Sequence, residues 1–172
     1  MTRIEFNRLY GTYSPTQSSS RPKAAALSCA CSTSIAAFRA ELRRGLAVLI
    51  AGTHPKILLL SIENIVAHWR ALQSDPTARK VFATGYSLDC ALGAQVPRSW
   101  LTNVEARTRA LNLVEAEVCS TVPYCLYDGG TYFNLPLRAR YFSRADYQHL
   151  SLAGQRALAA AEWKVAQKIL YL

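Results

Sequence analysis

An amphipathic helical pattern followed at once by a short apolar run is the feature that most restricts the fold of this chain. Residues 32–50 begin with serine and threonine, which are good N-cap types, and continue with apolar residues at helical spacing. Gly52 and Pro55 end this pattern, and the apolar run at 56–62 is typical of a strand buried on both faces. A helix, a short loop and a buried strand predict the α/β class.

The second half of the sequence has the same order of elements. Residues 100–118 have a helical pattern, residues 122–127 can form a strand, and Ser151 can cap a last helix over 151–170. On the first of these helices one face carries Leu101, Val104, Leu111, Val114 and Val118. The last helix is expected to make apolar contacts through Leu158, Ala161, Trp163, Val165 and Ile169. Two helix-to-strand passages predict a parallel sheet with covering helices. The segment between 74 and 97, which separates the two passages, is rich in loop signals.

The length and the charge indicate one basic globular domain. The chain has 172 residues, of which 51% are hydrophobic, and a formal net charge of +9. Residues 1–60 hold eight basic and two acidic residues, and the stretch 11–23 is rich in serine, proline and threonine. We therefore expect a poorly ordered basic leader at 1–28 and a folded domain at 29–172. No apolar run reaches the roughly 18 residues of a membrane span, and the first residues do not form a signal peptide.

The cysteines and histidines do not indicate a metal site or a bound cofactor. The cysteine spacings match neither zinc knuckles nor a thioredoxin-like motif, and two disulfides with one spare thiol or five reduced thiols fit them equally. The five cysteines are Cys29, Cys31, Cys90, Cys119 and Cys125. Three scattered histidines do not form a metal cluster, and His68 is interpreted as a structural histidine. The tryptophans at 69, 100 and 163 are expected to pack in the core or at its boundary.

Asp146 and His149 form the clearest catalytic pattern. An aspartate three residues before a histidine on one loop can place its carboxylate against one imidazole nitrogen and leave the other nitrogen as a general base. The alternative is structural: Asp146 is a turn residue, and His149 merely precedes a capped helix.

Three segments together resemble the SGNH (GDSL-type) hydrolases, in particular the secreted bacterial esterase and lipase-like subgroup. Asp146-x-x-His149-Leu-Ser-x-x-Gly-Gln before a helix is similar to the last conserved block of that family. Residues 61–69 (Ser-Ile-Glu-Asn-Ile-Val-Ala-His-Trp) are similar to its Ser-Ile-Pro-Asp/Asn-Ile-x-x-x-Trp segment, with Glu63 in place of proline. The Asp-Gly-Gly-x-x-Phe run within 127–134 resembles a third family segment, and the similarity covers about residues 29–168.

The resemblance implies a fold, an activity and a compartment. The implied fold is a three-layer α/β/α arrangement with a parallel sheet, and the implied activity is hydrolysis of a small-molecule or lipid carboxylic ester. His149 would be the general base and Asp146 its orienting carboxylate. Cys119 and Cys125 resemble the paired cysteines of the subgroup, and Cys31 and Cys90 are further disulfide candidates. The family implies an extracellular protein, although the N-terminus does not resemble a signal peptide.

Two expected parts of that family are missing from the sequence. We find no Gly-Asp-Ser nucleophile block and no Gly-x-Asn-Asp block for the oxyanion. Ser14 lies in a polar leader and is a poor nucleophile candidate, and Asn64 follows the wrong strand and is interpreted as a loop residue. The nucleophile is thus unknown, and we expect an N-terminally truncated or degenerate domain that lacks the first strand, with weak or lost activity. Such a domain should have exposed strand edges and marginal stability or a tendency to associate.

The alternative function is a noncatalytic basic binding or remnant protein, whose N-terminal region contacts anionic surfaces or nucleic acid. The sequence has no helix-turn-helix, aromatic RNA-binding signature or zinc spacing, so specific nucleic-acid binding is not expected.

Overall fold

The computed structural model describes residues 34–52, 55–83 and 98–169. The elements, in chain order, are α2 (Ile35–Ile50), β1 (Ile57–Leu59), α3 (Ile65–Leu72), α4 (Pro76–Ala83), α5 (Arg98–Ser120), β2 (Cys125–Tyr127), the 3-10 turn η3 (Ala139–Tyr141) and α6 (Leu152–Ile169). The expected leader at 1–28, which includes Ser14, lies outside the described residues, and so do Cys29, Cys31 and Cys90.

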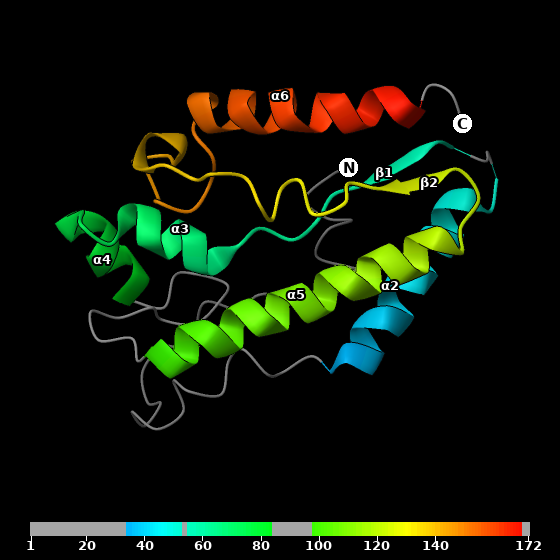
Figure 1. The fold of residues 1–172 in the computed structure, drawn as a ribbon, viewed down its shortest axis with the longest axis horizontal. Coiled ribbons are helices and arrows are strands. Elements are labelled where there is room, and N and C mark those ends of the chain that lie inside the picture. The colour runs from blue at the N-terminus through cyan, green and yellow to red at the C-terminus, as the bar shows by residue number, and fades with distance from the viewer. Residues whose placement is uncertain (1–33, 53–54, 84–97, 170–172) are drawn as a thin grey trace.

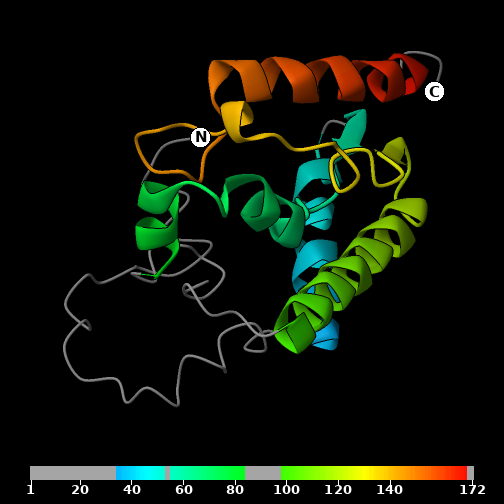
Figure 2. The same cartoon turned by 60° about the vertical axis from the view of Figure 1, so that its left-hand side comes forward.

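The two strands form a parallel sheet, as the sequence predicts. Ile57 lies opposite Cys125 and Leu59 opposite Tyr127. Helix α6 packs on one side of this pair, and α5 with α2 lies on the other side (Figures 1 and 2). The chain is therefore a mixed helix and strand fold. The prediction of a strand buried on both faces is wrong: all three residues of β1 are half-buried and Leu60 is 38% exposed, because a sheet of two strands leaves its edges uncovered in the part described.

Helix α2 begins where its sequence predicts. Ser34 Oγ accepts a hydrogen bond from the Ala37 amide at 3.0 Å, which caps the helix. Leu46 is buried against α5, and it joins a cluster with Val114, Val118, Ile35, Phe38, Leu42, Ile57 and Val122. Val48 departs from the expected apolar face and is 77% exposed. Two residues turn a helix by about 200°, so Val48 lies opposite Leu46.

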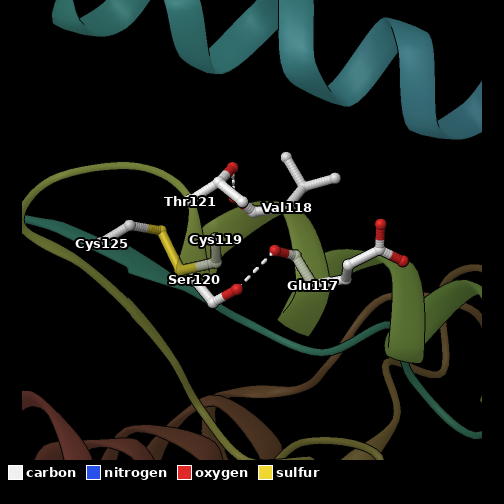
Figure 3. The surroundings of a disulfide bond; sticks show 6 residues. All are labelled: Glu117, Val118, Cys119, Ser120, Thr121 and Cys125. Carbon is white, nitrogen blue, oxygen red and sulfur yellow. Dashed lines mark hydrogen bonds between the residues drawn. A yellow bond between two sulfur atoms is a disulfide. The ribbon is translucent and has the colours of Figure 1, made fainter.

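A disulfide joins the end of α5 to the start of β2. Cys119 and Cys125 are bonded across a separation of six residues, with their Cα atoms 5.4 Å apart (Figure 3). The hydroxyls of Ser120 and Thr121 donate to the carbonyls of Glu117 and Val118, each at 2.7 Å, which satisfies two acceptors in the last turn of the helix. The predicted apolar face of α5 is confirmed, with Val104, Val114 and Val118 buried.

Residues 64–83 form two helices that the sequence analysis did not identify. Asn64, which was interpreted as a loop residue, is the N-cap of α3, and its side-chain oxygen accepts from the Ala67 amide at 3.0 Å. Asp75 accepts from the amides of Thr77 and Ala78, and Pro76 is the first residue of α4. Aspartate followed by proline was read as a loop signal, but the same pair starts a helix when the proline occupies its first turn.

A second apolar cluster lies around α3 and α4. Its buried members are Trp69, Leu72, Ala78, Phe82, Phe142 and Tyr147. The core position predicted for Trp69 is thus confirmed. The prediction for Trp163 is wrong, because its side chain is 59% exposed. Trp163 lies about 180° around α6 from the buried Gly154 and about 120° from the buried Ile169, and so faces away from the packed side of the helix. The side chain of Trp100 lies outside the described residues.

Gly154 allows α6 to lie against the backbone of η3. A Cβ atom at this position would lie 2.1 Å from the carbonyl oxygen of Tyr141. None of the helices in the described segments is long and apolar enough to cross a bilayer.

We predict that Gly154→Ala lowers the free energy of unfolding by about 1–3 kcal/mol, because the Tyr141 backbone must move to admit the methyl group. The matched control is Gly45→Ala in α2, where no atom lies within 4 Å of the added Cβ. This change should stabilise the protein by about 0.5–1 kcal/mol. Urea unfolding of both variants measures the difference, and equal stability of Gly154→Ala and the wild type would contradict the close approach.

Candidate active site

Asp146 and His149 are in contact on the loop between η3 and α6. The loop is closed by an antiparallel bridge between Phe142 and Leu150, and the Ser143 amide donates to the His149 carbonyl at 2.8 Å. Asp146 Oδ2 lies 2.6 Å from His149 Nδ1. Its Oδ1 atom accepts from the amides of Gln148 and His149 at 3.0 and 3.1 Å. The aspartate side chain is therefore fixed by the backbone as well as by the imidazole.

The electrostatics of this pair favour a base. Burial raises the pKa of Asp146, but hydrogen bonds from the Gln148 amide and from the His149 ring and amide outweigh burial and lower it. Asp146 is thus a carboxylate, which can only accept a hydrogen bond, so the neutral imidazole must carry its proton on Nδ1. The Nε2 lone pair is then free to take a proton. The His149 side chain is 84% exposed, so solvent or a ligand can reach Nε2.

His68 holds the loop that carries the pair. Its Nε2 lies 2.9 Å from the carbonyl oxygen of Tyr147, and its ring stacks on Phe142 with centroids 3.7 Å apart. Tyr147 has a φ of 58°, in the left-handed region that non-glycine residues rarely adopt. The His68 contact and the burial of the Tyr147 ring stabilise this conformation, and so fix the turn between Asp146 and His149. His68 is structural, as the sequence analysis proposed, and it acts next to the candidate site.

A polar chain continues from His68 to the turn after β2. Glu63 Oε1 lies 3.0 Å from His68 Nδ1, and Glu63 Oε2 accepts from the Tyr132 hydroxyl at 2.8 Å. Burial, and then the charge of Glu63, raise the pKa of Tyr132 well above its usual value. Tyr132 is therefore a hydrogen-bond donor at all ordinary pH values. In the sequence, Glu63 stands out only by replacing the proline of the family pattern, whereas in the structure its carboxylate connects α3 to the turn after β2.

Asp128 is the most highly connected carboxylate of the described residues. Its Oδ2 accepts from the amide and hydroxyl of Ser61 at 2.8 and 2.7 Å and from the Tyr132 amide at 3.1 Å. Its Oδ1 accepts from the Gly130 amide at 2.7 Å. Burial raises the pKa of Asp128, but the bonds from Ser61, Tyr132 and Gly130 lower it overall. Ser61 is 2% exposed and its hydroxyl is committed to Asp128, so Ser61 is unsuited to nucleophilic attack.

Two further buried carboxyls lie near Asp128. Burial, then the charge of Asp128, raise the pKa of Glu162 to about 7. Burial also raises the pKa of Glu115 to about 7, with a smaller contribution from Asp128 and an opposing hydrogen bond from Ile62. Both residues sit within the apolar faces of their helices, close in angle to Ile169 and Val118. In the sequence, each of these glutamates is the single acidic residue on an otherwise apolar helical face. That pattern predicts a buried acid, and the expectations above do not include it.

The structure brings together only part of the predicted site. Asp146 and His149 meet, and Cys119 pairs with Cys125. Within the described segments, no serine hydroxyl is hydrogen-bonded to the His149 ring, and no three histidine, cysteine, aspartate or glutamate side chains are arranged to hold a metal ion. No protein-family model, curated protein or solved structure matches the chain.

The raised pKa of Glu162 predicts a pH-dependent stability. Between about pH 4.5 and 7 the folded state holds the Glu162 proton more tightly than the unfolded state, so stability falls as the pH rises through this range, by at most about 1.4 kcal/mol per pH unit for this carboxyl. We expect Glu162→Gln to be more stable than the wild type at pH 8 and equally stable near pH 4. Urea unfolding across this pH range measures the effect.

Glu41→Gln is the matched control, because Glu41 is an exposed glutamate on α2 that pairs with Arg44. It should have little effect on stability at either pH. A Glu162→Gln variant whose stability follows the wild-type pH profile would show that Glu162 is not the group responsible.

Proposed function

We propose that this chain is a carboxylic ester hydrolase of the SGNH type, in which His149 is the general base and Asp146 orients it. The observation that carries the proposal is the 2.6 Å contact between Asp146 Oδ2 and His149 Nδ1, while the rest of the His149 side chain is exposed to solvent. The similarity of residues 61–69, 127–134 and 146–155 to segments of that family supports the same reading.

The chemistry of such a pair is proton transfer to and from an acyl centre. His149 Nε2 takes a proton from the attacking hydroxyl while the new bond to the ester carbonyl carbon forms. The Asp146 carboxylate stabilises the resulting imidazolium, which then gives its proton to the leaving alcohol as the ester C–O bond breaks. With water as the attacking group, one ester and one water yield one carboxylic acid and one alcohol.

The expected rate is low. The described residues supply a base and its orienting carboxylate but no serine bonded to the ring, so water is the nucleophile that these residues can activate. In triad hydrolases the members act as a unit, and loss of one of them lowers the rate by orders of magnitude. A small-molecule or lipid ester with a good leaving group is thus the substrate on which activity should be detectable.

Hydrolysis of p-nitrophenyl butyrate by the purified chain tests the proposal. We expect a slow rate that exceeds that of free imidazole at the same concentration, because the protein holds the tautomer fixed. His149→Ala should reduce the rate to background and Asp146→Asn should lower it about tenfold or more. The matched control is His54→Ala, which removes another histidine and should leave the rate unchanged.

An unchanged rate in His149→Ala, with the variant folded by circular dichroism, would contradict the proposal. A wild-type rate no higher than that of free imidazole would favour a noncatalytic basic binding protein. A fluorophosphonate probe identifies the nucleophile separately, since it labels activated serines. We expect no stoichiometric labelling. Labelling of a serine that depends on His149 would show that a serine, and not water, attacks the ester.

A further inference from the structure

The outer face of α6 exposes two large apolar side chains in line. Leu152 is 64% exposed and Trp163 is 59% exposed. Trp163 follows Leu152 by eleven positions, which places the two residues about 20° apart around the helix and about 16 Å apart along it. Arg156, Ala159 and Ala160 are also exposed on this outer side. Exposed tryptophan is uncommon on a protein surface that contacts only water.

The exposed charges of α6 are all positive. Arg156 is exposed within about 40° of both Leu152 and Trp163, and Lys164 and Lys168 are exposed about 100° and 140° around the helix from Trp163. Glu162, the only acidic residue of the helix, is buried. The preceding η3 segment adds exposed Arg138 and Arg140. Of the two acidic residues between 129 and 169, Glu162 faces the fold and Asp146 is held by His149. The segment 129–169 therefore presents cations without an exposed, unpaired carboxylate of its own.

We propose that the outer face of α6 docks on the surface of an anionic lipid bilayer. Tryptophan and leucine on one face of a helix with flanking lysine and arginine favour the membrane interface, where the apolar groups enter the headgroup region and the cations meet anionic lipids. The proposal is independent of the hydrolase chemistry. A second copy of the chain fits this face poorly, because a two-fold contact would place its cations against the same cations.

The fold favours docking over insertion. Gly154 and Ile169 are buried on the inner side of α6, so the helix is held to the rest of the protein at both ends while its outer side remains open (Figures 1 and 2). Leu152 also follows His149 by three residues. Docking through α6 therefore brings the exposed imidazole near the lipid surface.

Binding of the full chain to vesicles of phosphatidylglycerol and phosphatidylcholine, compared with pure phosphatidylcholine, tests the proposal. We expect binding to the anionic vesicles only. The triple variant Arg156→Gln, Lys164→Gln, Lys168→Gln should bind at least about fivefold more weakly, because Arg156 lies beside Leu152 and Trp163 and a cation near the surface contributes about fivefold. The matched control is Arg70→Gln, Arg79→Gln, Lys80→Gln, which removes three exposed cations from α3 and α4 and should cause a much smaller loss.

Tryptophan fluorescence locates the contact. Brominated lipids should quench the emission of a Trp100→Phe variant, and adding Trp163→Phe should remove that quenching, because the remaining tryptophan, Trp69, is buried. Leu152→Ser should weaken binding, and Leu113→Ser on α5, which removes a leucine that is 72% exposed elsewhere, should not.

Three results would overturn the proposal. These are equal binding to neutral and anionic vesicles, equal losses in the two triple variants, and quenching that persists when Trp163 is replaced in the Trp100→Phe variant. Salt-sensitive binding to DNA that depends on the α6 cations, with no binding to vesicles, would assign the face to nucleic acid instead and would also overturn it.

Discussion

The carboxylate of Asp128 is the interaction on which the rest of the described structure depends. It follows β2 directly and accepts four hydrogen bonds from Ser61, Gly130 and Tyr132. Bonds to a buried carboxylate are stronger than neutral ones, so the end of β1 is fixed relative to the turn after β2. Glu63 and Asn64 follow in sequence, and α3 then carries His68 to the Tyr147 carbonyl. The position of the Asp146 and His149 pair is thus set by contacts that begin at Asp128.

The same region contains an electrostatic conflict. Asp128 remains ionised because its hydrogen bonds favour the charge, while the nearby Glu115 and Glu162 have pKa values raised to about 7. Ionising either glutamate would bury a second negative charge without a matching cation among the contacts described. We therefore expect stability to fall as the pH rises through neutrality, most directly at α6, which carries Glu162.

The sequence predicted the elements better than their environment. Ser34 and Ser151 cap their helices as expected, because capping depends on local backbone geometry. The parallel pairing of the strands was also predicted. Their partial burial was not, because the burial of a strand depends on how many other strands and helices lie beside it. An aspartate followed by a proline occurs both in loops and at the start of helices, so Asp75 and Pro76 do not distinguish the two. The packing of Ala78 and Phe82 is what favours the helix.

The candidate site was predictable only where it is local. Asp146 and His149 are three residues apart, so their contact follows from one turn. The support from His68, Glu63 and Tyr132 joins residues 69 to 79 positions apart in sequence, and no local pattern indicates it. Trp163 was assigned to the core from its apolar character alone, whereas its angle around α6 relative to Val165 and Ile169 already placed it on the outer side.

Nitrogen-15 NMR of the histidine rings tests the central claim, that Asp146 holds His149 as a base, most directly. We predict that the neutral ring of His149 carries its proton on Nδ1, whereas the ring of His68 carries a proton on Nε2, which donates to Tyr147. Asp146→Asn should leave His149 as a mixture of tautomers and should not change His68. A proton on Nε2 of neutral His149 in the wild type would contradict the claim, because that nitrogen could not then accept a proton from an attacking group.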